Sequence, residues 1–244
     1  MLSLDTLILM HMQIDNDILK HLRVIQICDS NFPIGSFNHS YGMETYLRNN
    51  VIDDAKSFSK WVDLFLKHQF ITSDGLAIRM LYEALENGDV DKVWEIDNLL
   101  IAQTVAKETR NAAKLVASRM IKIYLDLYEI ENLKIYAKKI ASKEVYGHPA
   151  IVFGLLMHDL EMSKEEAIKL HMYSTVSTII QNAVRAIPLG QKDGQLLVKE
   201  YSEKFNHYYK LIEELDFDSF GANTPGIELS QINHETLVFR LFMS

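Results

Sequence analysis

The chain has 244 residues, of which 48% are hydrophobic and 24% charged, and its formal net charge is −8. This composition is typical of a globular protein with a large core, and the negative charge argues against nucleic acid as the main partner. The single cysteine, Cys28, excludes an intrachain disulfide and favours a reducing compartment, so we expect the cytoplasm. No apolar run reaches the roughly 18 residues that a membrane helix needs, so no membrane partner is expected.

The N-terminal segment 1–17 has no clear periodicity, and we expect it to be poorly ordered. It lacks the basic region and the cleavage site of a signal peptide. From residue 18 onward the pattern becomes helical, because Ile18, Leu22, Ile25 and Cys28 have the spacing of one helix face.

The middle of the chain has the pattern of successive amphipathic helices. Asp53–Asp54 and Ser73–Asp74 are expected to begin two of them, and Ser163 with Glu166 has the spacing of a capping box at the start of another. We count about ten helices and no credible strand. Residues 18–244 are therefore predicted to form a single all-α domain, a bundle of about ten helices.

The stretch 184–195, VRAIPLGQKDGQ, interrupts the most apolar helical run. Pro188 removes a backbone donor and clashes with the preceding turn, so the first helix should end near Ile187. Gly190 and Gly194 permit a tight reversal. We interpret the stretch as a structured corner between two long helices.

Residues suited to catalysis or metal binding do not form a recognisable motif. The nine histidines make no HxH or HExxH pattern, and no phosphate-binding GxxxxGK[ST] loop occurs. The lysines from Lys134 to Lys143 are expected to be a solvated helix face. We therefore assign no catalytic, cofactor-binding or metal residue and predict that the chain is not an enzyme.

Two apolar segments favour contact with a partner protein. The loop from Asp29 to Glu44 has aromatic residues among proline and glycine, and the chain ends on RLFMS, without a polar tail. Apolar residues in such places must be buried internally or against a partner. The candidate partner-binding residues are Phe37, His39, Tyr41, Glu44, Arg240, Leu241, Phe242 and Met243.

Four segments contain motifs that are informative in combination. Residues 32–44 fit F/LP-x-G-S/G-F/Y followed by S-x-G-x-E; Glu108-Thr109-Arg110 with Arg119 is similar to an E-L-R motif, although Thr109 replaces the usual leucine. The third is His148 followed by Phe153-Gly154, and the fourth is R-x-x-P-L-G-Q-x-D-G-Q at residues 185–195. Together with the closing RLFMS, they resemble the UreF family of urease accessory proteins.

The resemblance implies a UreF-like all-helical homodimer without a cofactor. Such proteins bind the accessory protein UreD (UreH in some organisms), recruit the GTPase UreG, and help to deliver nickel to apo-urease. The resemblance also indicates structural roles for the corner residues, with contact to a partner protein as the alternative: Asp193 as a helix cap, Gln191 and Gln195 as hydrogen-bond partners, and Arg185 as an ion-pair or carbonyl anchor. The whole corner set is Arg185, Pro188, Gly190, Gln191, Asp193, Gly194 and Gln195.

Other functions compete with this interpretation. The chain could regulate the GTPase activity of UreG, for which Arg110, Arg119 and Arg185 are candidates by residue type only. It could instead be a helical hydrolase or lyase that uses His148 and a carboxylate. A DNA-binding regulator is the third alternative, but the Lys134–Lys143 set is central and lacks arginine.

Overall fold

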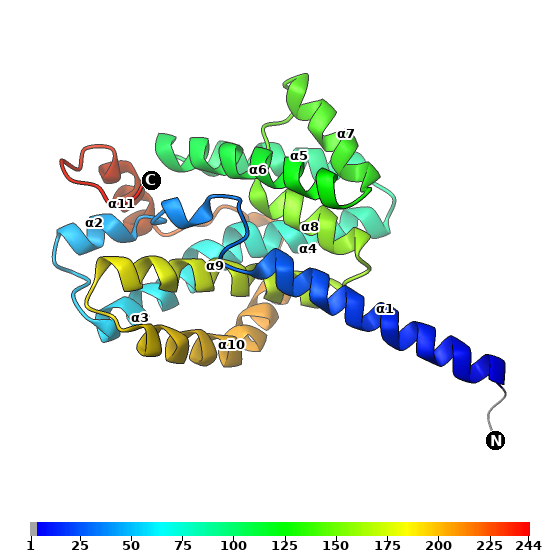
Figure 1. The fold of residues 1–244 in the computed structure, drawn as a ribbon. Helices are drawn as coiled ribbons and strands as arrows, with labels where there is room; N and C mark the ends of the chain where they lie inside the picture. The colour runs from blue at the N-terminus through cyan, green and yellow to red at the C-terminus, as the bar shows by residue number, and fades with distance from the viewer. Residues whose placement is uncertain (1–3) are drawn as a thin grey trace.

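The computed structural model describes the backbone of residues 4–244 and the side chains from Asn16 onward. This part of the chain consists of helices and loops without a strand, which confirms the predicted all-α fold (Figure 1). A π-helical segment, η2 (Leu66–Gly75), and the short 3-10 helices η1 (Ser36–Asn38) and η3 (Phe217–Ser219) accompany the α-helices. The α-helices are α1 (Leu4–Cys28), α2 (Met43–Arg48), α3 (Ala55–Phe65), α4 (Leu76–Glu86), α5 (Val90–Gln103), α6 (Lys107–Leu127), α7 (Glu131–Ala141), α8 (Pro149–Asp159), α9 (Lys164–Ala186), α10 (Gln191–Glu214) and α11 (Pro225–His234).

Helix α8 lies at the centre of the fold. Every residue from Ala150 to Met157 is buried, because α8 is apolar on all sides and must be enclosed. Helices α4, α6, α7 and α9 pack around it. Gly154 permits the close approach of α4, since a Cβ there would lie 3.0 Å from Leu81 Cδ1. The buried apolar residues form one contiguous cluster that includes both Val24 and Phe242.

Polar caps begin several helices where the sequence predicts them. Asp54 caps α3 and forms a capping box with Ser57. Ser163 and Glu166 form the predicted capping box of α9, in which each side chain accepts the other residue's backbone N–H.

The predicted helix start at Ser73–Asp74 is wrong. Both residues lie near the end of η2, which joins α3 to α4 without a break. The wider π-helical turn changes the angular position of the following residues, and such segments occur frequently at functional sites. Here η2 turns Asp74 toward the interior.

Helix α1 is longer than predicted and projects beyond the bundle (Figure 1). Its predicted inner face is also wrong, because Ile18, Leu22 and Ile25 are exposed, whereas Val24, Ile27 and Cys28 are buried. Which residues of α1 are buried depends on how α1 lies against α9. The spacing of apolar residues does not specify that orientation. The poor order expected for residues 1–17 stays a prediction; α1 begins at Leu4, and residues 1–3 lie outside the described residues.

The corner between α9 and α10 is shorter than the predicted stretch 184–195, because α10 already begins at Gln191. Helix α9 ends at Ala186, and Pro188 and Gly190 precede α10. Gly194 lets the two helices pack closely, since a Cβ there would lie 3.0 Å from Val184 Cγ2. Gly190 occupies the N-cap position of α10, so Asp193 lies in the first turn of the helix. There its carboxylate interacts favourably with the positive end of the helix dipole.

The polar residues of the corner divide into two groups. Gln191 and Gln195 are exposed, and neither side chain makes a hydrogen bond to the part of the chain that the structure describes. Arg185 does act as a carbonyl anchor, because its Nη1 donates to Phe37 O at 3.3 Å. The corner therefore contacts the loop of the first motif through one side chain.

None of the described helices is both long enough and apolar enough to cross a membrane.

Asp97 fixes the loop that enters α8. Its carboxylate is fully buried and accepts the backbone N–H of Tyr146 at 2.8 Å and of Gly147 at 3.1 Å. It also accepts the hydroxyl of Tyr136, whose oxygen in turn accepts His148 N–H at 2.9 Å. Burial and the nearby Asp97 charge raise the pKa of Tyr136, so that hydroxyl keeps its proton.

We expect Asp97→Ala to lower the free energy of unfolding by about 3 kcal/mol, because three buried donors lose their acceptor. Urea denaturation measures this. Asp126→Ala, an exposed carboxylate on α6, is the control and should change stability by less than about 0.5 kcal/mol. Equal stability of the two variants would contradict the assigned role of Asp97.

Candidate functional site

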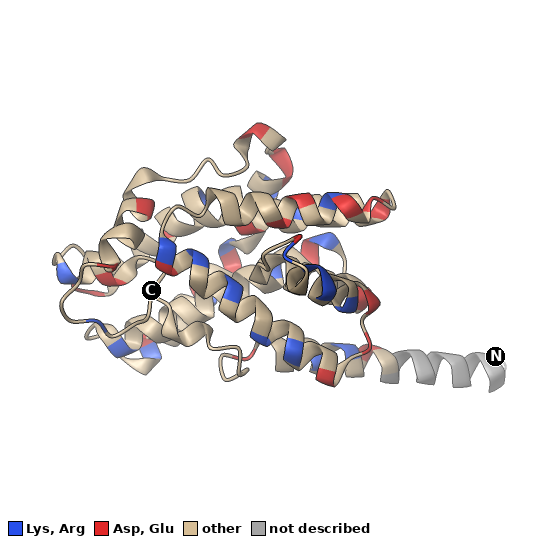
Figure 2. Ribbon diagram, turned by 90° about the horizontal axis from the view of Figure 1, so that it is seen from above, with Lys and Arg blue, Asp and Glu red and all other residues tan. Residues whose placement is uncertain are grey.

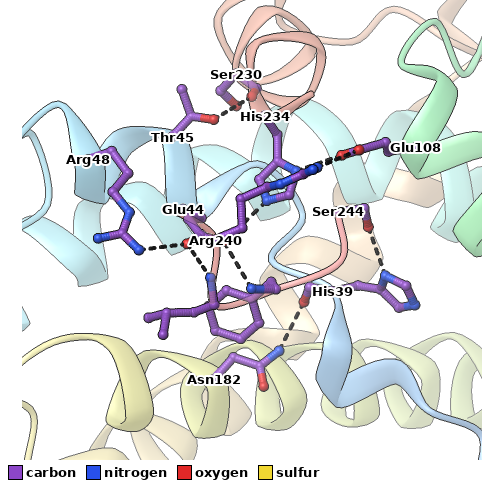
Figure 3. Close-up of polar contacts among 12 residues, drawn as sticks. His39, Glu44, Thr45, Arg48, Glu108, Asn182, Ser230, His234, Arg240 and Ser244 are labelled. Atoms are coloured by element: carbon purple, nitrogen blue, oxygen red, sulfur yellow. Dashed lines mark hydrogen bonds and ion pairs between the residues drawn. The ribbon is translucent and has the colours of Figure 1, made fainter. Parts of the chain in front are cut away.

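The C-terminal tail, residues 237–244, docks on the loop that follows α1. Met243 N–H donates to Asn38 O at 2.7 Å, and Ser40 N–H donates to Ser244 O at 2.5 Å. His39 Nδ1 and Ser244 Oγ lie 2.8 Å apart (Figure 3). The chain end is therefore held by backbone pairing as well as by side chains.

The Glu44 carboxylate is the centre of this docking (Figure 3). It lies on α2, is fully buried, and accepts the backbone N–H groups of Leu241 at 2.7 Å and Phe242 at 3.0 Å. Arg48 Nη2 lies 3.1 Å from Glu44 Oε1, the same oxygen that accepts Leu241 N–H. Burial by itself raises the pKa of Glu44, but these hydrogen bonds and one from His234 outweigh burial and hold the pKa below its usual value.

His234 links Glu44 to a second carboxylate. Its Nε2 lies 3.1 Å from Glu44 Oε2, and its Nδ1 lies 2.7 Å from Glu108 Oε2. Both ring nitrogens of His234 therefore lie at hydrogen-bond distance from a carboxylate oxygen. Arg240 of the tail completes the set, with its Nη1 2.7 Å from Glu108 Oε1. Three helices and the tail thus share one network of ion pairs.

Helix α9 holds the other side of the loop. Asn182 Nδ2 donates to His39 O at 2.9 Å. The Arg185 guanidinium lies 5.7 Å from the ring centroid of Phe242, so this residue contacts both the loop and the tail. The first motif, the corner and RLFMS, far apart in sequence, therefore meet at one place.

The predicted partner-binding residues separate into buried and exposed groups. His39, Glu44 and Phe242 are buried within the chain, and Tyr41, half-buried, packs its ring 5.8 Å from that of Phe65. His39 and Glu44 hold the tail through hydrogen bonds, and Phe242 is a buried side chain of the tail itself. Arg240 is exposed but is engaged with Glu108.

The exposed group is apolar. The exposed fractions of Leu241, Phe242 and Met243 are 57%, 4% and 61%, which is the alternation expected of an extended chain against a surface. Val238 and Phe239, which the sequence prediction missed, are exposed by 88% and 77%. RLFMS is the only signal that pointed to this segment. We call the exposed group the tail patch: Phe37, Val238, Phe239, Leu241 and Met243.

A cavity of about 140 Å³ lies beneath the loop that follows α1, on which the tail docks. His148, His171 and Asp74 line it, and His171 Nε2 is 2.9 Å from Asp74 Oδ2. Burial lowers the pKa of His148, whose Nδ1 accepts Ala150 N–H and so caps α8. In the residues whose side chains are described, no group of three or more histidine, cysteine or acidic residues is arranged to hold a metal ion.

Removal of the Glu44 charge should loosen the tail. We expect Glu44→Gln to speed hydrogen exchange at the amides of Leu241 and Phe242 by about ten-fold or more, because the neutral amide binds His234 and Arg48 less strongly. Exchange mass spectrometry measures this. Glu203→Gln on α10, an exposed partner of Lys199, is the matched control, and unchanged tail exchange in Glu44→Gln would contradict the assignment.

Stability should fall as the pH falls below about 6.5. Burial and the nearby Arg119 lower the pKa of His39 from 6.5 to about 4, so the unfolded chain takes up a proton in this window and the folded chain does not. The free energy of unfolding then decreases by up to about 1.4 kcal/mol per pH unit. Denaturation at pH 7, 6 and 5 measures this slope, and His39→Asn should reduce it; an unchanged slope would contradict the prediction.

The sequence of the chain is similar to those of known proteins over nearly its whole length. The UreF family profile matches residues 52–202. The urease accessory protein UreF of Lachnoclostridium phytofermentans is 44% identical over 91% of this chain and 98% of its own length. UreF of Streptococcus salivarius and that of Streptococcus thermophilus are each 46% identical over 92% of this chain and 94% of their own. The chain thus belongs to the UreF family of urease accessory proteins.

Proposed function

We propose that the chain is a non-enzymatic scaffold in urease maturation. In this role it binds UreD/UreH through the tail patch, recruits the GTPase UreG, and docks with both on apo-urease for nickel insertion. Nickel and GTP are then handled by the partners. We further propose that the chain works as a homodimer in the cytoplasm.

The tail patch is the observation that supports this proposal. Its side chains are exposed, and the backbone N–H groups of Leu241 and Met243 are hydrogen-bonded to Glu44 and Asn38, so this part of the patch does not have to be ordered when a partner binds. An exposed apolar group of this kind is typical of a protein–protein interface. Membership of a urease accessory protein family supports a partner among the proteins of urease maturation.

Regulation of the UreG GTPase is the second candidate. A regulator that stabilises transition-state charge needs an arginine that can reach a phosphate. Arg110 and Arg185 are engaged with backbone carbonyls of their own chain. Arg119 is exposed, so it is the arginine that favours this role.

A hydrolase or lyase that uses His148 remains the third candidate. The cavity brings His148 near the Asp74–His171 pair, which is the carboxylate that this alternative requires. Burial alone raises the pKa of Asp74, but the hydrogen bonds from His171 and Ser73 and the nearby charges of His148 and His171 together outweigh burial and keep the pKa below its usual value. Assays of the purified chain for hydrolytic turnover, with His148→Ala as the control, test this role.

Phe239→Asp should abolish or strongly weaken co-purification with UreD/UreH while the melting temperature stays unchanged. A charge placed on an exposed apolar anchor costs binding free energy without disturbing the core. Leu196→Asp on α10 is the matched control, since Leu196 is also exposed, by 55%, and lies outside the patch. If Phe239→Asp retains UreD/UreH as well as the wild type does, the tail patch is not the docking site.

A further inference from the structure

Helix α6 carries a row of cations on the surface of an acidic protein. Five of its residues are basic and two are acidic, a net charge of +3, whereas the rest of the chain, with 20 basic and 31 acidic residues, has a net charge of −11. Figure 2 shows these cations following one another along α6. We call Lys107, Arg110, Lys114, Arg119 and Lys122 the α6 ridge.

The spacing along α6 places the three lysines of the ridge on one side of the helix. Lys107, Lys114 and Lys122 follow one another at intervals of seven and eight residues, or about two turns, so they are separated by about 11 Å along the axis. Lys107, Arg119 and Lys122 are exposed, and Lys114 is half-buried, with its Nζ 4.4 Å from the ring centroid of Tyr146.

The ridge is not neutralised by its own chain. Among the side chains described, no residue of the ridge is in a salt bridge, whereas several lysines elsewhere pair with neighbouring carboxylates, as at Lys92–Glu95, Lys169–Glu165 and Lys204–Glu200. Of the two acidic residues of α6, Glu108 is engaged with His234 and Arg240. Asp126 lies about one turn beyond Lys122 and forms no salt bridge with it.

The N-terminal end of the α6 ridge lies next to the segment that carries the tail patch. Arg240 binds Glu108 at 2.7 Å, and Glu235 Oε1 accepts Lys107 N–H at 3.2 Å, so the start of α6 touches the segment that follows α11. Val105 and Leu115, exposed by 50% and 41%, add apolar surface beside the cations. Apolar side chains and a charged border therefore lie on one continuous surface, as in protein interfaces.

We propose that the protein partner docked on the tail patch extends along α6 and presents a row of carboxylates to the ridge. This inference rests on the proposed function, because it concerns the same partner. A folded protein fits better than a nucleic acid. The apolar residues beside the ridge suit a protein surface, and the remaining net charge of −11 repels a long polyanion.

The test compares the binding of UreD/UreH to the full-length chain and to two charge-reversal variants. Lys114→Glu with Lys122→Glu reverses the charge at the centre and at the C-terminal end of the ridge. Lys56→Glu with Lys60→Glu, two exposed lysines on α3, makes the same change of charge on the opposite side of the bundle from α6 (Figure 1). Circular dichroism and melting temperature confirm that each variant is folded.

The ridge variant should bind UreD/UreH about ten-fold more weakly than the wild type at low salt, mainly through a slower association rate, and the α3 variant should not. The difference should shrink at about 0.5 M NaCl, where the screening length is only a few ångströms. Equal affinity of the ridge variant and the wild type overturns the inference and leaves the proposed function standing.

Two other outcomes are separate from this one. If the wild-type chain does not bind UreD/UreH at all, the proposed function fails and this inference fails with it. If a duplex DNA of about 20 base pairs binds the wild type and displaces UreD/UreH from it, the ridge is a nucleic-acid surface and the inference is overturned.

Discussion

A single buried carboxylate, that of Glu44, holds the C-terminal tail in its position. Glu44 has no access to water, and a charge in that position is stable only if hydrogen bonds replace its hydration. Two of these bonds come from the backbone of the tail, and the others come from Arg48 and His234. The buried charge of Glu44 on α2 therefore needs the hydrogen-bond donors of the tail, just as the tail needs Glu44 to be held in place.

The exposed side chains of the tail follow from the same requirement. Because consecutive amides of Leu241 and Phe242 both face Glu44, the segment is extended, and its side chains alternate between the core and solvent. Phe242 packs inward beside Arg185, while Leu241 and Met243 point out. The interaction that anchors the segment therefore also determines which of its side chains are exposed.

The sequence predicted the features that depend on neighbouring residues. The all-α fold, the capping box at Ser163 and the end of α9 before Pro188 are local, and all are confirmed. The features that depend on distant residues were missed or wrong. The inner face of α1, the turn of Asp74 toward the cavity, and the pairing of His234 with Glu108 depend on how helices lie against one another, and apolar spacing does not specify those directions.

The tail patch and the α6 ridge act over different distances. Apolar contact is gained only when surfaces touch, whereas the field of five cations extends about 8 Å into a solution of physiological ionic strength. A partner that carries carboxylates would first be oriented by the ridge and then held by the patch. The salt bridge between Arg240 and Glu108 ties the two surfaces together, so loss of the Glu44 contacts would disturb the patch while the charge of α6 stays in place.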